Sequence, residues 1–172
     1  IFPAGVTSVA LRQLDCRIYG AGYRSAECPG LLEDFRAEGP ERYKIGIFHG
    51  DPMRLQSPYC PVTSAQVRDS GLDYLALGHI HKAQTFGNCR ARYCGTPLPV
   101  SFDEVRSGYE HGFSIVEIDA HGSLPSIRTV DVECPHPLIS IPAEGHAPWN
   151  EVIAELKDFP SDIKAYIRLN VL

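Results

Sequence analysis

Apolar residues gather in short runs along the chain, and several of these runs stop abruptly at polar residues. The segments 15–20, 43–51 and 73–79 are apolar stretches that end at glycine, histidine or aspartate. Segments 111–120 and 124–133 instead mix apolar and polar positions, as half-buried strands do. The pattern therefore predicts a strand in each of these five segments.

A short helix is predicted between the second and third of these strands. Thr63 and Gln66 have the spacing of a capping box, and Gly71 fits the stop that follows a helix. Residues 43–79 then form a strand, a loop, a helix and a second strand. Such a unit is expected to be parallel and right-handed.

The pattern changes in the second half of the chain. Residues 90–104 are rich in proline and glycine and predict an irregular segment, and another proline-rich break follows residue 134. Residues 149–159 have apolar positions at helical spacing, and residues 162–172 alternate as a strand. We expect a separate small α/β unit from about residue 135, cut short at Leu172.

Composition narrows the class of protein. The chain has 172 residues, 44% of them hydrophobic and 22% charged, as in ordinary globular proteins. No apolar run approaches the roughly 20 residues that span a bilayer, and no leader is evident, which favours a cytoplasmic protein without membrane contact. The first residue is Ile1 rather than Met, so we expect a piece of a longer protein.

Charge and cysteine content exclude further classes. A net charge of −5 argues against a protein that binds nucleic acid through a basic surface. It allows an enzyme that meets phosphates through metal ions, which supply positive charge locally. The six cysteines include no CxxC pair and predict reduced thiols. A disulfide between Cys89 and Cys94 is the less favoured alternative.

Three histidines carry the candidate chemistry. His49 ends the second predicted strand, and His79 and His81 follow the third. The carboxyl ends of neighbouring parallel strands meet at one edge of a sheet, where ligands bind. Neutral imidazole ligates zinc, manganese and iron, and two histidines at i and i+2 can face two different ions. Each histidine alone has an ordinary structural interpretation, but together they predict a metal site.

Three blocks of sequence support this prediction by resemblance. "IGIFHGD" (45–51), "DYLALGHIHKAQ" (73–84) and "YCGTPLPVSFDE" (93–104) resemble successive blocks of the calcineurin-like metallophosphoesterase superfamily, nearest to its SbcD-like DNA-repair exonuclease branch. The resemblance implies an α/β fold: the C-terminal half of a two-sheet sandwich with layered helices, then part of a small α/β capping domain. We expect the metallophosphoesterase part in residues 1–134 and the start of the capping domain in 135–172.

The resemblance also implies roles for individual residues. His49 and His79 would ligate one divalent ion and His81 the second, with manganese the expected metal. Asp51 is expected to be an ordinary turn residue. Lys82 is a candidate phosphate contact, with a solvated surface lysine as the favoured alternative. The residues expected to contact the metal ligands and hold them in position are Gly78, Ser101, Asp103 and Glu104.

The family's earlier blocks are not found in this sequence. An Asp-x-His block, a bridging aspartate and an Asn-His block are expected upstream, and nothing before residue 43 replaces them. The catalytic residues are therefore expected outside this chain. We expect the intact protein to be a metal-dependent DNA exonuclease or phosphodiesterase, and this piece alone to be nearly inactive. DNA, a second copy of the protein and a coiled-coil ATPase subunit are the partners that the resemblance implies.

Other interpretations stay open at this point. One is a metallophosphoesterase of another branch, acting on a non-DNA phosphoester. Another is a non-catalytic nucleic-acid-binding or scaffold domain. A structural zinc domain would need Cys89 or Cys94 near a histidine. Among the remaining residues, His111 is expected in a turn, His121 in solvent, and Phe102 and Tyr93 in the core rather than stacked on a base.

Overall fold

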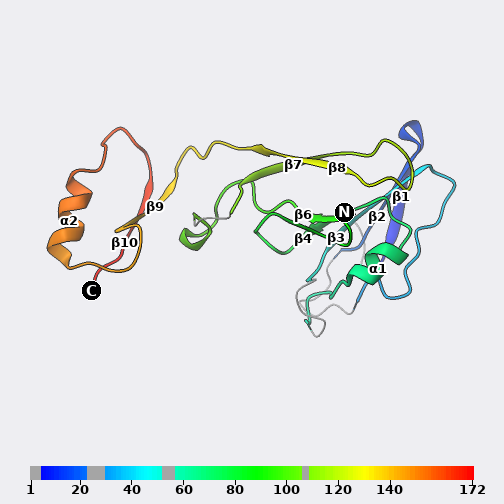
Figure 1. Ribbon diagram of the computed structural model, residues 1–172, viewed down its shortest axis with the longest axis horizontal. Coiled ribbons are helices and arrows are strands. Elements are labelled where there is room, and N and C mark those ends of the chain that lie inside the picture. The colour runs from blue at the N-terminus through cyan, green and yellow to red at the C-terminus, as the bar shows by residue number, and fades with distance from the viewer. Residues whose placement is uncertain (1–4, 23–29, 52–56, 106–108) are drawn as a thin grey trace.

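A mixed six-stranded sheet forms the body of the protein (Figure 1). The computed structural model describes residues 5–22, 30–51, 57–105 and 109–172. The strand order is β1-β2-β3-β4-β6-β5, with β2, β3, β4 and β6 parallel and both edge strands antiparallel. The strands are β1 (Thr7–Leu11), β2 (Cys16–Gly20), β3 (Tyr43–His49), β4 (Tyr74–Gly78), β5 (Gln84–Phe86) and β6 (Ala91–Tyr93). A 3₁₀ turn, η1 (Arg12–Leu14), joins β1 to β2.

The predicted parallel unit is confirmed at the centre of this sheet. Strands β3 and β4 are parallel neighbours, and the helix α1 (Ser64–Asp69) lies between them in sequence. The Thr63 hydroxyl accepts a hydrogen bond from the Gln66 N–H at 3.1 Å, and the Gln66 side chain accepts one from the Thr63 N–H at 2.8 Å. Gly71, with φ of +74°, ends the segment in a conformation that glycine adopts without strain.

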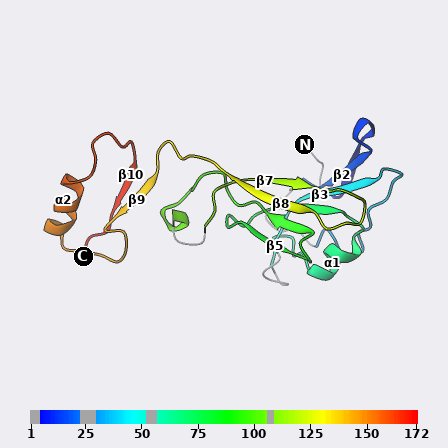
Figure 2. The same ribbon diagram turned by 45° about the horizontal axis from the view of Figure 1, so that its top comes forward.

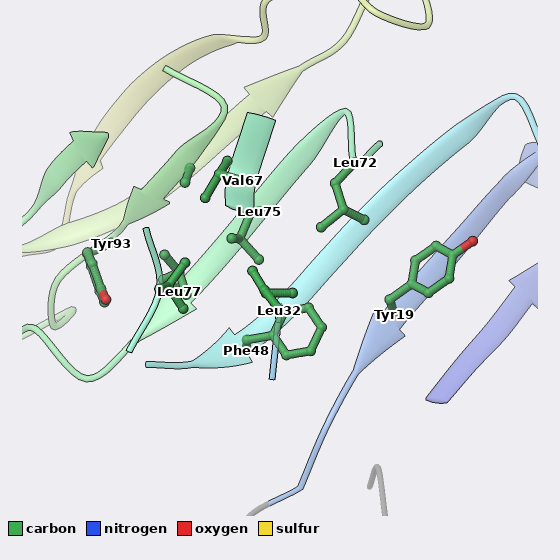
Figure 3. Packing of buried hydrophobic residues seen from close by; sticks show 10 residues of the cluster. Tyr19, Leu32, Phe48, Val67, Leu72, Leu75, Leu77 and Tyr93 are labelled. Atoms are coloured by element: carbon green, nitrogen blue, oxygen red, sulfur yellow. The ribbon is translucent and has the colours of Figure 1, made fainter. Parts of the chain in front are cut away.

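The hydrophobic core lies on one face of the sheet. Alternating residues of β2, β3, β4 and β6 point to this face, where they meet Leu32 and Val67 of the covering segments (Figure 3). The residues contributed by these strands include Tyr19, Phe48, Leu75, Leu77 and Tyr93, each at most 5% exposed.

The opposite face of the sheet is covered by a hairpin. Strands β7 (Gly112–Glu117) and β8 (Ser126–Asp131) pair antiparallel and lie along the sheet (Figures 1 and 2). Arg92 of β6 donates to Ser114 of β7 at 3.0 Å and to Thr129 of β8 at 2.9 Å. These contacts fix the hairpin over the β4–β6 side of the sheet.

The rest of that face is open among the described residues. Val9 pairs with Ile18 and Ile18 with Ile45, so these residues share the face opposite the core, and Ile47 lies two residues further along the same strand. Val9 is 53% exposed and Ile47 is 49% exposed. The β1–β3 side of the sheet therefore presents apolar side chains to solvent.

The C-terminal residues form the predicted strand–helix–strand arrangement, called the C-terminal unit below. Strand β9 (Leu138–Ile141), helix α2 (Trp149–Lys157) and strand β10 (Tyr166–Leu169) stand at the other end of the molecule from β1 (Figure 1). The two strands are parallel, and Ile141 and Val152 are at most 2% exposed. A second 3₁₀ turn, η2 (Phe102–Val105), contacts β9.

For several elements the sequence patterns gave no prediction or predicted the wrong structure. Strands β1 and β5 were not predicted, and β6 falls inside the segment 90–104 that predicted irregular structure. A three-residue strand carries too few alternating positions to give a pattern. Strand β10 is also shorter than the predicted segment 162–172. Within the described residues, no helix is both long and apolar enough to cross a membrane.

Candidate metal-binding site

His49 and His79 meet at the carboxyl edge of the central strands. His49 is the last residue of β3, and its register partner on β4 is Gly78, the residue before His79. The His49 Nε2 and His79 Nδ1 atoms are 3.2 Å apart, and the ring centroids are 5.1 Å apart. The convergence predicted for these two histidines from the parallel unit is therefore correct.

The backbone turns sharply at this edge of the sheet. The sharp turn after β4 lies at His79, whose φ is +117°, an uncommon value for a residue with a Cβ. Strain of this kind is concentrated at functional sites. Gly78 instead provides space, because a Cβ there would lie 3.2 Å from the His49 Nδ1 atom. Gly50 acts similarly, since a Cβ there would be 2.6 Å from the Cys60 carbonyl oxygen.

The electrostatic surroundings favour the neutral form of His49. Partial burial lowers the pKa of the His49 imidazole, and the neighbouring His79 ring lowers it further. A neutral imidazole ring has one nitrogen that can accept a hydrogen bond or bind a metal ion. That is the form in which histidine ligates a metal.

Tyr59 joins the histidine pair, and no sequence signal pointed to it. Its ring centroid lies 5.5 Å from that of His79, and the side chain is 43% exposed. The Asp51 N–H lies 3.0 Å from the carbonyl oxygens of both Tyr59 and Cys60, which ties the loop to the end of β3. Asp51 is thus not a simple turn residue: it is 7% exposed and forms an isolated bridge with Pro61.

His81 is held by a carboxylate. Its Nδ1 atom lies 2.7 Å from the Glu104 Oε1, while the other Glu104 oxygen accepts the Val100 N–H at 2.9 Å. Burial raises the pKa of Glu104, but the hydrogen bond from Val100 and the His81 ring outweigh it, so the net pKa lies below the ordinary value. An ionised carboxylate only accepts hydrogen bonds. The Nδ1 of His81 therefore carries the proton of this contact, and Nε2 is the ring nitrogen that does not face Glu104.

The remaining residues predicted for the site are Ser101, Asp103 and Lys82, and only Ser101 contacts Glu104. Ser101 accepts the Glu104 N–H through its backbone carbonyl at 3.1 Å. Asp103 points elsewhere, toward Arg168, with 3.6 Å between the charged atoms. The Lys82 ammonium lies over the Tyr109 ring, 5.7 Å from its centroid.

Two further histidines, His111 and His121, make side-chain contacts within the fold. The His111 Nε2 atom is 3.1 Å from the Glu104 carbonyl oxygen, so this ring braces η2. His121 is exposed at a turn, as predicted, and its Nδ1 atom also lies 2.9 Å from a carboxylate oxygen of the buried Asp73. Tyr93 is 0% exposed, as a core residue should be.

The ring nitrogens of His49 and His79 lie close enough together to face one ion. Two imidazole nitrogens that bind one ion tetrahedrally at ~2.0–2.1 Å are about 3.3 Å apart, and the observed 3.2 Å between His49 and His79 agrees with that separation. Across the described ranges, no group of three or more His, Cys, Asp or Glu side chains is arranged to hold a metal ion. Cys89 and Cys94 are not joined in a disulfide and are exposed thiols.

Comparison with known proteins shows that the chain is similar in sequence to subunits of nucleases and to a DNA-repair protein. The chain is 35% identical over 129 residues to a subunit of the nuclease SbcCD from Rhodobacter capsulatus, covering 75% of this chain and 27% of that protein. It is 43% identical over 68 residues to the corresponding SbcCD nuclease subunit of Escherichia coli, covering 38% of this chain and 16% of that protein. A DNA double-strand break repair protein Mre11 of Methanococcus maripaludis is 28% identical over 130 residues, covering 70% of this chain and 34% of that protein. No family model matches the chain.

Proposed function

Because the chain belongs to the SbcD-like family of metallophosphoesterases and spans about a third or less of these curated relatives, we propose that it is part of a metal-dependent DNA exonuclease. The substrate would be a DNA phosphodiester bond. The observation that carries this proposal is the His49–His79 pair at the ends of adjacent parallel strands, with 3.2 Å between ring nitrogens.

The histidines are proposed to hold ions rather than to move protons. His49 and His79 would share one divalent ion, and His81 would bind a second through Nε2. When bound, two such ions, which we propose to be manganese, neutralise phosphate charge and activate water. The chain's own contribution is to hold the three imidazoles in position. Glu104 does this for His81 through the 2.7 Å contact to Nδ1.

The missing ligands are proposed to come from a further layer of the fold. His49 has the same strand parity as Ile47, so both belong to the sheet face opposite the core. A second layer over Val9 and Ile47 would therefore lie beside the histidines. Such a layer would make the two-sheet sandwich of the intact protein. We propose the division at residues 134 and 135, with the capping domain beginning at 135.

The names of the relatives support DNA as the partner. Two of them are subunits of a nuclease, and a third is a DNA double-strand break repair protein. We propose that the intact protein acts on DNA in the cytoplasm, as a homodimer together with a coiled-coil ATPase subunit.

The test is manganese titration of this chain, followed by NMR of its histidine rings. We expect selective paramagnetic broadening of the His49, His79 and His81 ring signals at high manganese concentration, with little nuclease turnover on DNA. His121 is the internal control, because its ring contacts Asp73 instead. Unbroadened signals from all three histidines would exclude the metal site.

Measurements of DNA hydrolysis and DNA binding distinguish an incomplete metal site from a complete one and from a scaffold domain. Robust manganese-dependent DNA hydrolysis by this chain alone would contradict the proposal that ligands are missing. Steeply salt-dependent DNA binding that is indifferent to manganese would instead favour a scaffold domain.

A further inference from the structure

One short turn, η2, contacts both the candidate metal site and the C-terminal unit. Glu104 of this turn lies against His81, with 2.7 Å between Oε1 and Nδ1. Phe102 and Asp103 of the same turn lie against Arg168 of β10. Contacts to two parts of the molecule therefore arise from three consecutive residues.

Arg168 connects this turn to both strands of the C-terminal unit. Its guanidinium carbon lies 5.0 Å from the centroid of the Phe102 ring, a cation–π distance, and one nitrogen is 3.6 Å from the Asp103 carboxylate. Its Nε atom donates to the Ser140 hydroxyl of β9 at 3.2 Å. A displacement of β9 and β10 relative to the body of the protein would therefore pull on η2.

Glu104 has little freedom to move relative to η2. Its side chain is held at both oxygens, by His81 and by the Val100 N–H, and the residue is only 7% exposed. Its own N–H donates to the Ser101 carbonyl, and the His111 ring lies against its carbonyl oxygen. If η2 moves, the carboxylate moves with it, and the orientation of the His81 ring changes.

A pocket borders Arg168. A cavity of about 870 Å³ lies between η2 and the C-terminal unit, with Phe102, Val105, Ser140 and Arg168 among its lining residues. Figures 1 and 2 show the unit at one end of the molecule, joined to the body by the extended segment between β8 and β9. The contact through Arg168 is thus a defined link across an interface that close packing does not fix.

We propose that Arg168 is a positioning residue for the metal site. By holding Phe102 and Asp103, it sets the placement of η2, and through Glu104 it sets how His81 presents its Nε2 atom. The position of the C-terminal unit is thereby coupled to the orientation of one metal ligand. Only the identity of His81 as a ligand rests on the proposed function, since the chain of contacts does not depend on it.

The experiment records NMR signals of the His81 ring in the metal-free chain. Glu104→Gln defines the displacement of these signals when the carboxylate is lost. We expect Arg168→Met and Phe102→Leu to displace the His81 signals in the same direction, while Arg168→Lys, which keeps the cation, stays near the original positions. Arg128→Met, at an exposed arginine of β8, is the matched control and should leave them unchanged.

Folding is followed through the backbone amide signals of β9 and β10, so that a local change is separated from unfolding of the unit. If Arg168→Met unfolds the unit, Phe102→Leu tests the same contact from the side of η2. The proposal is overturned if the His81 signals keep their positions in the folded variants although Glu104→Gln displaces them.

A manganese titration separates this proposal from the proposed function. In Arg168→Met we expect the manganese concentration that half-broadens the His81 signal to rise about 2- to 30-fold, the range typical of such coupling, with a smaller change at His49. If no histidine ring of the original chain responds to manganese, the metal site is wrong. The displacement of the His81 signals by Arg168→Met would still establish the coupling.

Discussion

At the residue scale, the position of the His49 ring depends on the side chain that Gly78 lacks. A Cβ at residue 78 would lie 3.2 Å from the His49 Nδ1 atom, closer than most such contacts. The neighbouring His79 already has an uncommon φ of +117°. The pair therefore has little room to adjust, and its 3.2 Å separation depends on glycine at this position.

Gly78→Ala tests this dependence. We expect the substitution to displace the His49 ring and to weaken manganese-induced broadening of the His49 and His79 signals, with a stability loss below about 1 kcal/mol. Gly30→Ala is the matched control, because the nearest atom to a Cβ there is 3.6 Å away. Unchanged manganese broadening in Gly78→Ala would show that the ring has room to shift.

Asp73 illustrates how a buried carboxylate can be stabilised away from the site. It is 1% exposed and accepts hydrogen bonds from the Lys44 and Gly122 N–H groups at 2.9 and 2.8 Å. Burial raises the pKa of Asp73, but these two bonds and the His121 ring outweigh it, so the net pKa lies below its ordinary value. Asp73 thus fastens the β7–β8 hairpin to the sheet in its ionised form.

This shift predicts the pH dependence of stability. A lowered native pKa stabilises the folded state above the ordinary aspartate pKa of about 3.9, and the stabilisation is lost as pH falls through the native pKa. We expect Asp73→Asn to cost about 1–3 kcal/mol near pH 7, and less as the pH is lowered to about 2. Urea denaturation across this range measures the difference. A difference that is independent of pH would contradict the assignment.

At the element scale, the stability of α1 comes from its N-terminal cap rather than from its length. The helix has six residues, too few to be stable by itself. It contributes Val67, 1% exposed, to the core. The reciprocal hydrogen bonds between Thr63 and Gln66 satisfy N–H groups that the first turn would otherwise leave unpaired.

Thr63→Ala should therefore destabilise the protein by about 1 kcal/mol, within the usual range for lost caps. Thr63→Ser keeps a hydroxyl that accepts the Gln66 N–H and should retain most of the stability. Denaturation midpoints of the two variants provide the comparison. Equal losses in both would mean that the threonine methyl group, and not the cap, stabilises this end of α1.

At the scale of the whole molecule, one half of the sheet face opposite the core is exposed among the described residues. The hairpin β7–β8 protects the β4–β6 half, where Tyr74 is 6% exposed. Burial raises the pKa of Tyr74 to about 12. On the β1–β3 half, Val9 and Ile47 are 53% and 49% exposed. Exposed apolar patches of this kind commonly mark interaction surfaces.

The double substitution Val9→Thr with Ile47→Thr tests this surface. Both residues are on strands, where threonine is well tolerated, so we expect stability to change by less than about 1 kcal/mol. Binding of the dye ANS to the folded chain should fall, because the dye reports exposed apolar surface. If the variant binds as much ANS as the original chain, the apolar surface that the dye reports lies elsewhere.

Much of the architecture followed from local patterns. The apolar runs that end at His49 and His79 and the capping residues Thr63 and Gln66 were enough to predict the parallel β3–α1–β4 unit. The strand–helix–strand character of the C-terminal residues followed from the spacing of their apolar positions. Short edge strands such as β5 and β6 were missed because pairing with neighbours, and not their own three residues, defines them.

By itself, the sequence determined that His49 and His79 share one edge of the sheet, because strand direction and chain order are local properties. Tertiary structure decided the rest. The 3.2 Å contact of the two rings, the Glu104 carboxylate behind His81 and the Tyr59 ring beside His79 join segments far apart in sequence. No periodicity encodes such contacts, since each depends on how separate loops pack after the strands have paired.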